Sequence, residues 1–322
     1  MKFISYVINE NKSIDKMSSF KQYESVFYHE PESKPTNSKI AGFDLDWTLT
    51  YNEKHLFAKE PDDVFIFPNR KYVLEKLIDD GYTIVIFTNQ FAKSKKEKQK
   101  KVERLSTFIT KLNLPLYVFV STEKDNYRKP CIDMWTLFKK IYSSEVSNVF
   151  YIGDALGRRQ DFSDSDKLFA ENINAEMKPP EDFFGISEIP TFTQDKELIV
   201  FVGMPGSGKS SYYSKYLKDH IHIEQDKIGS RPRLLKELDR SLLTGKSIVV
   251  DSTNPDQENR LEYYERAQKH GYIIKVLYFL INGTGFNKLR EKPVPDIVYH
   301  IYFKKLVPPN NENTPGEVIY IY

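Results

Sequence analysis

The sequence predicts an α/β protein of two domains, each built around a mainly parallel sheet. Apolar, β-rich runs alternate with helical patterns in both halves of the chain, as in parallel sheets covered by helices. The 322 residues suffice for two cores. Residues 178–194 carry three prolines and a glycine without any period, which is typical of a connector. We therefore expect residues 39–190 and 191–322 to fold as two domains.

Each half shows its own order of elements. Apolar positions alternate in residues 1–38 until Pro31 and Pro35, so we expect an N-terminal extension that adds an edge strand or hairpin to the first sheet. The first half predicts strands at 39–43, 82–87, 116–120 and 149–152, and helices at 70–80, 93–112 and 132–142. The second half predicts strands at 198–202, 222–224, 247–250 and 273–279, and helices that begin at Gly208, cover 234–243 and end at His270.

Composition excludes several classes of protein. With 40% apolar residues and 22 Phe and 21 Tyr, the chain is too aromatic for a disordered or fibrous protein. A net charge of +2 gives no protein-wide attraction for polyanions, so any nucleic-acid contact must be local. The single cysteine, Cys131, forms no intramolecular disulfide, which fits a reducing compartment. Neither a signal peptide nor a membrane span is apparent, so we expect an intracellular protein of the nucleus, the cytoplasm or a viral replication site.

Two acids follow the first strand of residues 39–190. Asp44 and Asp46 lie two residues apart, so in an extended chain their side chains point the same way, towards the crevice beyond the strand ends. Such a pair alone is a weak signal that often only caps a loop. Further polar groups follow other strands or precede helices: Thr88 with Asn89, Lys129, and Asp154.

In this order the motifs resemble those of the haloacid-dehalogenase phosphatase superfamily. The resemblance implies that Asp44 attacks phosphorus and that Asp46 serves as general acid and then general base. It also implies that Thr88 binds a phosphoryl oxygen and that Lys129 offsets negative charge. The same resemblance places Mg²⁺ between Asp44, Asp154 and the carbonyl of Asp46.

Two further features concern the substrate of this first site. Many members of the superfamily have glycine where this chain has Trp47, which either shapes the mouth of the pocket or packs against the scaffold. The intervals between the motifs are filled by scaffold elements, so no large cap domain fits. We expect an open site that favours a polymer or protein end over a small metabolite.

The second half carries a nucleotide-binding motif. Residues 203–210 read GMPGSGKS, directly after an apolar strand and before a helical pattern, which is the context of a P-loop. In such a loop the backbone binds ATP phosphates, the lysine reaches the β/γ oxygens, and the serine after it ligates Mg²⁺. The residues expected to bind ATP are Gly203, Gly206, Ser207, Gly208, Lys209, Ser210 and Ser211, with Ser210 as the metal ligand.

Acids and arginines complete this second site. Asp226 ends a strand-like run and is placed to accept a proton from a hydroxyl, while Asp251 is placed to order the metal or the loop. For either acid the alternative is a helix N-cap. Bidentate phosphate recognition would suit four arginines that follow, Arg231, Arg233, Arg260 and Arg290, although surface arginines are common.

The two sets of motifs together resemble the polynucleotide 5′-kinase/3′-phosphatases. The strings IAGFDLDWTL, IFTNQ, IGDALGR, GMPGSGKSS and DSTNPDQENR carry this resemblance, in the domain order of the eukaryotic-type enzymes. It implies that Asp226 is the kinase base and that Arg290 is a lid arginine acting on the transferring phosphoryl group. It also implies substrate contacts by Arg158 and Arg233, to which we add Asn89 and Arg260, and an acidic motif completed by Asp161.

We therefore expect an enzyme that removes 3′-phosphates and phosphorylates 5′-hydroxyls of DNA with ATP and Mg²⁺, preparing breaks for ligation. The alternatives are the same chemistry on RNA ends, a fused metabolite phosphatase/kinase, and a catalytically silent end-binding scaffold. We expect a monomer without membrane contact, and no forkhead-associated domain, because only 38 residues precede Lys39. Possible ligase or repair partners stay undefined by the sequence.

A run of basic residues follows Thr88. Six lysines and one arginine are expected on one helix: Lys93, Lys95, Lys96, Lys98, Lys100, Lys101 and Arg104. Such a run is either a solvated helix face or a track for a phosphate backbone beside the first site.

Overall fold

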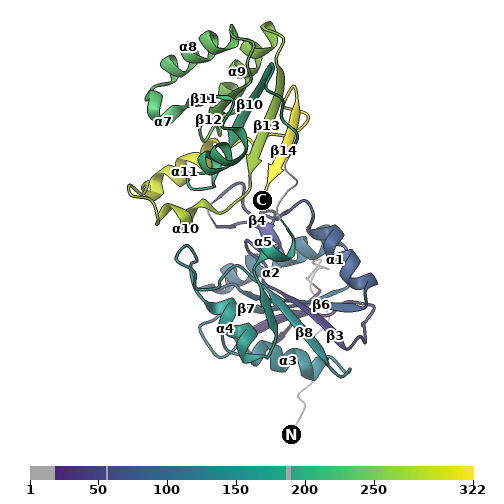
Figure 1. Cartoon of the computed structure of the whole chain (residues 1–322). Helices are drawn as coiled ribbons and strands as arrows, with labels where there is room; N and C mark the ends of the chain where they lie inside the picture. The colour runs from purple at the N-terminus through teal and green to yellow at the C-terminus, as the bar shows by residue number, and fades with distance from the viewer. Residues whose placement is uncertain (1–18, 56, 186–189) are drawn as a thin grey trace, which may run out of the picture.

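The computed structural model describes residues 19–55, 57–185 and 190–322. It contains two large sheets with helices on both faces, one above the other in Figure 1, which confirms the predicted α/β class and its two-part organisation. The boundary near residue 190 stays a prediction. The last helix of the first part is α5 (Pro180–Phe183), and the first strand of the second is β10 (Glu197–Val202).

The first sheet has seven strands in the order β1-β2-β7-β6-β3-β8-β9. Its centre is parallel, while β1 (Phe20–Tyr23) and β2 (Val26–His29) form a hairpin that pairs antiparallel with β7. The other strands are β3 (Lys39–Phe43), β6 (Tyr82–Asn89), β7 (Leu116–Ser121), β8 (Asn148–Ile152) and β9 (Glu176–Lys178). Residues 1–18 of the expected N-terminal extension lie outside the described part of the chain.

Alternating strand residues build two separate cores on this sheet. Ala41, Phe43, Ile84 and Ile86 pack with α1 (Arg70–Asp79) and α2 (Lys95–Leu112) on one face. Their neighbours in sequence, such as Ile40 and Val85, pack with α3 (Asp133–Ile141) and α4 (Ser165–Asn172) on the other. This period of two is why each central strand is continuously apolar in sequence.

The second sheet has five parallel strands in the order β11-β12-β10-β13-β14. These are β11 (Ile221–Glu224), β12 (Ile248–Asp251), β13 (Ile273–Phe279) and β14 (Glu317–Ile321), with β10 in the middle. One face is covered by α8 (Arg231–Leu242) and α9 (Gln257–Lys269), and the other by α6 (Lys209–Tyr212) with the π-helical turn η1 (Tyr213–Leu217). Three more helices, α7 (Gln225–Ile228), α10 (Gly283–Asn287) and α11 (Asp296–Lys305), surround the carboxyl ends of the strands.

Several elements differ from the sequence prediction. The basic helix begins at Lys95 rather than at residue 93, because the Ser94 side chain accepts a hydrogen bond from the Glu97 N–H and caps it. The helix expected at 234–243 begins at Arg231, with Pro232 in its first turn. The hairpin of β4 (Thr50–Tyr51) and β5 (Phe65–Ile66) was not predicted, nor were β9, β14, α10 and α11.

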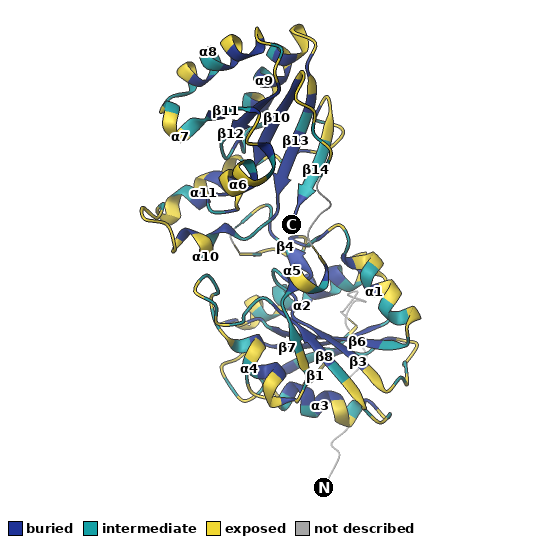
Figure 2. Cartoon of the chain, viewed as in Figure 1, coloured by how far each residue is buried: buried dark blue, intermediate teal, exposed yellow. Residues whose placement is uncertain are grey.

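The unpredicted β4–β5 hairpin joins the two parts of the molecule. Phe67 is 5% exposed and belongs to the same buried cluster as Leu198 and Val200 of β10. Tyr51 packs against this cluster too, and its OH donates to Glu53, which also accepts from Tyr278 Oη at 3.3 Å. In Figure 2 the ribbon around β4 is mostly buried where the two parts meet. The hairpin therefore contributes to the core of the second sheet.

Candidate active sites

Three acids meet at the carboxyl end of the first sheet. Asp44 follows β3, Asp154 follows the neighbouring parallel strand β8, and Asp166 lies in the first turn of α4. One carboxylate oxygen from each lies within 4.8 Å of the others. The Lys129 ammonium is buried between them, 2.6 Å from Asp44 Oδ1 and 2.6 Å from Asp166 Oδ1, and 2.8 Å from Tyr151 Oη. We call these four charged residues the acidic centre.

In the acidic centre three carboxyl groups share one ammonium, so ionisation of all three is unfavourable without a further cation. Burial raises the pKa of Asp44, and Lys129 only partly opposes this effect. Burial and the Asp44 charge raise the pKa of Asp154 as well. Burial lowers the pKa of Lys129, but the Asp166 and Asp44 carboxylates raise it above its usual value, so the ammonium stays charged. The need for a further cation and the all-oxygen donor set fit a divalent ion such as Mg²⁺.

Asp46 is held apart from this centre by its own partners. Arg104 Nη2 donates to Asp46 Oδ1 at 2.6 Å, and Gln90 Nε2 donates to Oδ2 at 2.6 Å. Burial by itself raises the pKa of Asp46. The Arg104 charge and the two donated hydrogen bonds together have the larger, opposite effect, and the pKa is lowered to about 2. Asp46 is therefore ionised at neutral pH, and the structure places its carboxylate with Arg104 rather than among the three acids of the centre.

Two predicted substrate groups lie at the end of β6. Thr88 is 1% exposed, and its hydroxyl accepts a hydrogen bond from Gln90 Nε2 at 2.9 Å. Asn89 forms a two-way bond with the backbone of Lys129: its Nδ2 donates to the carbonyl at 3.1 Å and its Oδ1 accepts from the N–H at 2.9 Å. This use of the Asn89 amide differs from the predicted substrate contact, because the side chain fixes the Lys129 loop.

The expectation that Asp161 completes the acidic motif is wrong. Its carboxylate accepts from Arg158 Nε at 2.9 Å and from the N–H groups of Leu156 and Arg158, away from the centre. Asp166 occupies the place instead, with 1% exposure. Arg158 is half-buried and also forms an ion pair with Glu181, so its guanidinium is bound by two carboxylates. Its predicted substrate contact requires these ion pairs to rearrange.

The second site is built around the loop between β10 and α6. Gly206 and Gly208 have φ of +80° and +89°, and a Cβ on Gly206 would lie 2.2 Å from the Gly283 carbonyl oxygen, so glycine is required there. Lys209 Nζ donates to the carbonyls of Gly203 at 2.9 Å and Met204 at 2.8 Å. Burial lowers the pKa of Lys209 to about 8 although Asp251 opposes the shift. Ser207 is buried, while Ser211 is exposed on α6.

The Ser210 hydroxyl and the Asp251 carboxylate form a hydrogen bond at the carboxyl end of the second sheet. Ser210 Oγ donates to Asp251 Oδ2 at 2.9 Å, and His222 Nε2 lies 3.1 Å from the same oxygen. The His222 ring stacks on Tyr213 with 3.6 Å between ring centroids. The Ser210 hydroxyl and the Asp251 carboxylate therefore lie together at the carboxyl end of β12 before any ligand binds.

The remaining predicted residues of the second site fall into two groups. Asp226 on α7, Arg233 on α8 and Arg290 after α10 are exposed, and the charges of Asp226 and Arg290 both act on Lys209. Arg260 is fully buried and donates to the carbonyls of Asn254, Pro255 and Val307 at 2.9, 2.8 and 2.6 Å. The predicted substrate contact by Arg260 is therefore wrong, since its guanidinium holds loops together.

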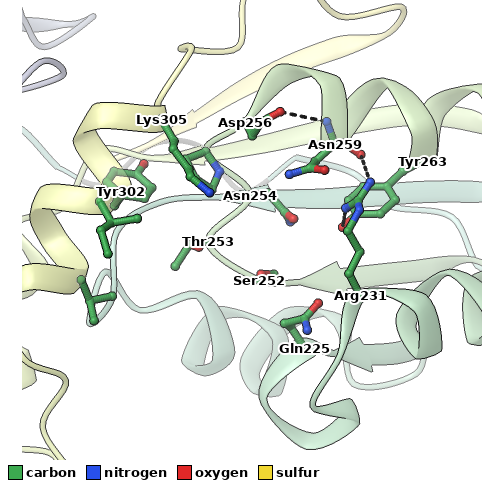
Figure 3. Close-up of a pocket in the computed structure, with 13 residues that line it drawn as sticks. Gln225, Arg231, Ser252, Thr253, Asn254, Asp256, Asn259, Tyr263, Tyr302 and Lys305 are labelled. Carbon is green, nitrogen blue, oxygen red and sulfur yellow. Dashed lines mark hydrogen bonds between the residues drawn. The ribbon is translucent and has the colours of Figure 1, made fainter.

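A cavity of about 270 Å³ lies between α7, α9 and α11, and Gln225, Asn259 and Tyr302 are among its lining residues. Figure 3 shows Tyr302 and Lys305 of α11 on one side and Arg231 against Tyr263 on the other, with Gln225, the first residue of α7, below Ser252. Arg231 donates to Tyr263 Oη at 2.9 Å and to Glu262 at 2.5 Å. Its guanidinium would have to leave these partners in order to bind a phosphate. The cavity is lined by polar groups and aromatic rings, and Gln225, the residue before the predicted base Asp226, is one of the lining residues.

The structure divides the basic run of α2. Arg104 and Lys101 face Asp46, Lys98 pairs with Glu123, and Lys100 pairs with Glu60 at 2.8 Å. The exposed members are Lys93, Lys95 and Lys96. A track for a phosphate backbone, if formed, is limited to this N-terminal end of the helix.

Sequence reasoning missed four residues of these sites: Gln90, Arg104, Asp166 and His222. Gln90 stands next to Thr88 and Asn89, which could have marked it, whereas the pairing of Arg104 with Asp46 spans 58 residues and leaves no local signal. Asp166 and His222 give no such signal, because their roles arise from tertiary packing. Among the described residues, no helix is both long and apolar enough to cross a bilayer.

Comparison with known proteins agrees with this geometry. Residues 39–184 match the family model described as polynucleotide kinase 3 phosphatase. The bifunctional polynucleotide phosphatase/kinase of Schizosaccharomyces pombe is 28% identical over 85% of this chain and 77% of its own length. A protein of Acanthamoeba polyphaga mimivirus, provisionally given the same name, is 28% identical over 96% of this chain and 90% of its own length. An uncharacterised 20.8-kDa protein of Autographa californica nuclear polyhedrosis virus is 36% identical over 45% of this chain and 85% of its own length. Residues 39–184 therefore form a domain of the polynucleotide kinase 3 phosphatase family.

Proposed function

We propose that the chain is a bifunctional enzyme that removes the 3′-phosphate and phosphorylates the 5′-hydroxyl of DNA ends. The observation that carries this proposal is the presence, in one chain that contains a domain of this family, of two separate phosphate-handling sites. One is the acidic centre around Asp44 and Lys129, and the other is the P-loop around Lys209. The products, a 3′-hydroxyl and a 5′-phosphate, are the ends that a ligase joins.

At the first site Asp44 is the nucleophile. Its carboxylate oxygen bonds to phosphorus, the bond from phosphorus to the 3′-oxygen breaks, and that oxygen takes a proton from Asp46. Water then attacks the aspartyl-phosphate, Asp46 takes the proton of the water, and inorganic phosphate leaves. Because Arg104 keeps Asp46 ionised in the free enzyme, the approaching phosphate dianion must raise the pKa of Asp46 before the first step.

Positive charge at this site comes from Lys129 and from a bound cation. Asp44, Asp154 and Asp166 would hold Mg²⁺, with the Asp46 carbonyl as a further ligand, and the ion would offset the charge of the phosphoryl oxygens. Thr88 would donate a hydrogen bond to one of those oxygens. Asn89 and Tyr151 act indirectly, through Lys129. Asn89 fixes the Lys129 backbone, and Tyr151 accepts a hydrogen bond from the Lys129 ammonium.

At the second site Asp226 is the general base. It takes the proton of the 5′-hydroxyl while the new bond to the γ-phosphorus of ATP forms and the bond to the β–γ bridging oxygen breaks, releasing ADP. Lys209 and Arg290 would stabilise the transferring charge, and Ser210 with Asp251 would hold Mg²⁺. The cavity lined by Gln225, Tyr263 and Tyr302 would receive the 5′-terminal nucleoside, with Arg233 on the phosphate that follows.

One duplex tests both halves of the proposal. It carries a nick with a 3′-phosphate and a 5′-hydroxyl and is incubated with Mg²⁺ and γ-labelled ATP. We expect Asp44→Asn to abolish phosphate release only and Lys209→Ala to abolish label transfer only. Asp182→Asn and Lys218→Ala, which change exposed residues of the two parts, are the matched controls and should retain both activities.

The same assay distinguishes the alternatives. A matching RNA nick processed in preference to the DNA nick would favour RNA ends, and turnover of mononucleotides in preference to both would favour a metabolite enzyme. If wild type acts on none of these substrates, the proposal is wrong.

A further inference from the structure

Trp47 lies in an unusual backbone position next to Asp46. Its φ is +63°, in the left-handed region that bulky residues rarely adopt. The Trp47 N–H donates to the Thr50 carbonyl at 2.7 Å, and the N–H groups of Leu49 and Thr50 donate to the Leu45 carbonyl at 2.9 and 3.0 Å. The turn that carries Asp46 is therefore closed by hydrogen bonds, and a tryptophan stands where glycine would fit without strain.

The Trp47 side chain leaves its own domain. It packs against the buried cluster of Met204, Tyr299, Tyr302 and Phe303, and also against the core on one face of the second sheet. Met204 belongs to the P-loop, and the three aromatic residues belong to α11. The residue directly after the proposed proton donor is thus anchored in the kinase domain.

The chain that follows Trp47 is anchored in the same way. Tyr51 packs on the core of the second sheet, Phe67 belongs to it, and Glu53 accepts a hydrogen bond from Tyr278. The Phe67 ring also lies 6.1 Å from the ring of Tyr322. These contacts lie at both ends of the β4–β5 hairpin, so the kinase domain holds the residues that enter and leave it.

We propose that Trp47 is a positioning residue for the phosphatase reaction, through which the kinase domain sets the place of Asp46. This inference rests on the proposed function. Arg104 and Gln90 fix the Asp46 carboxylate from the side of the first sheet, whereas only the backbone turn fixes its Cα. The packing of the Trp47 ring on the second domain fixes that turn. A proton donor displaced by a fraction of an ångström transfers its proton less efficiently, even when the nucleophile is intact.

The leaving group of the substrate separates positioning from a general structural role. A 3′-phosphate needs a proton on its departing oxygen, whereas p-nitrophenyl phosphate releases its phenolate without one. In the full chain we expect Trp47→Gly to lower kcat on a 3′-phosphorylated oligonucleotide by roughly tenfold or more, and on p-nitrophenyl phosphate by less than about threefold. KM for the oligonucleotide should stay within about twofold, and Trp47→Phe should restore most of the lost kcat.

Variants on the far side of the interface complete the test. Tyr302→Leu changes the cluster that receives Trp47 and should reproduce the selective loss, although it lies in the other domain. Tyr278→Phe removes only the hydrogen bond to Glu53 and keeps the buried ring, so its effect on the 3′-phosphorylated substrate should be much smaller than that of Tyr302→Leu. Thermal unfolding of each variant verifies that both domains are folded.

Several outcomes would overturn the inference. Equal losses on both substrates would show a structural role only, and unchanged turnover by Trp47→Gly would show no role. If wild type hydrolyses simple alkyl phosphates but not 3′-phosphorylated ends, the proposed function fails. The comparison of alkyl and aryl phosphates would then still test Trp47.

Discussion

The two sites differ in how their charged groups are held. In the acidic centre Lys129 is bonded to two carboxylates, and Asp46 is bonded to Arg104 and Gln90. At the P-loop, Lys209 bonds backbone carbonyls of its own loop, while Asp226 and Arg290 are exposed. The first site is preorganised before any substrate arrives, whereas the second must rearrange when ATP and the acceptor bind.

This difference has an energetic cause. A buried carboxylate without a partner is costly, so the acids of the first site need their cations in order to fold. Exposed acids and arginines incur no such penalty and keep their mobility, which suits a site that closes on two substrates. Changes in the first site should therefore affect stability and activity together, and changes in the second should affect activity alone.

The largest effect is expected from Lys129→Met. It leaves Asp44 and Asp166 buried without a cation, so phosphatase kcat should fall at least about 10³-fold and the free energy of unfolding by about 3–5 kcal/mol. Adding Asp166→Asn should restore part of the stability but not the activity, as measured by thermal unfolding and phosphate release. A stable single variant would contradict preorganisation of this site.

Asp226→Asn tests whether an exposed residue of the second site affects activity without affecting stability. We expect kinase kcat to fall by about 10²–10³-fold, because the hydroxyl loses its base, while the free energy of unfolding changes by less than about 0.5 kcal/mol. Label transfer and chemical denaturation measure the two quantities. Asp219→Asn, at another exposed acid, is the control; a large loss of stability in Asp226→Asn alone would show that this acid has structural partners.

Arg104→Gln should shift a pH profile. Without the guanidinium the pKa of Asp46 rises from about 2, so the acid remains protonated to higher pH, and we expect the acidic limb of the phosphatase kcat profile to move upwards. At neutral pH kcat should fall by roughly tenfold, because the carboxylate loses its orientation. Lys98→Gln, which breaks only a surface pair with Glu123, should leave the profile unchanged. An unmoved acidic limb in Arg104→Gln would mean that Asp46 does not determine it.

The smallest effect concerns the exposed start of α2. Replacing Lys93, Lys95 and Lys96 with Gln should weaken activity on long duplexes by about threefold at low salt, and should lower the salt dependence of KM, because fewer counterions are displaced. Mononucleotide turnover should be unaffected. Lys139→Gln with Lys140→Gln on α3 is the control, and equal losses on short and long substrates would exclude a backbone track.

The sequence predicted the residues that act through local spacing better than those that act through packing. Asp44 and Asp46, the P-loop and the strands around them follow from period and motif, because neighbours along the chain determine them. The role of Asp166 was assigned to Asp161 because the two acids lie five positions apart, and only the structure shows that Asp161 stays in the loop while Asp166 lies in the first turn of α4 and reaches the acidic centre. Arg260 was misassigned for the opposite reason, since an arginine pattern does not reveal burial. The two-residue strands β4 and β5 are too short for a periodic signal.

The position of Phe67 has a consequence for any attempt to divide the chain. Its ring belongs to the same buried cluster as Leu198, Val200 and Ile223, which lie 131 or more positions further along the chain. Residues 191–322 produced alone would present this apolar surface to water and would tend to aggregate. Production together with residues 1–190 should restore solubility, so the halves behave as a complementing pair rather than as interchangeable modules.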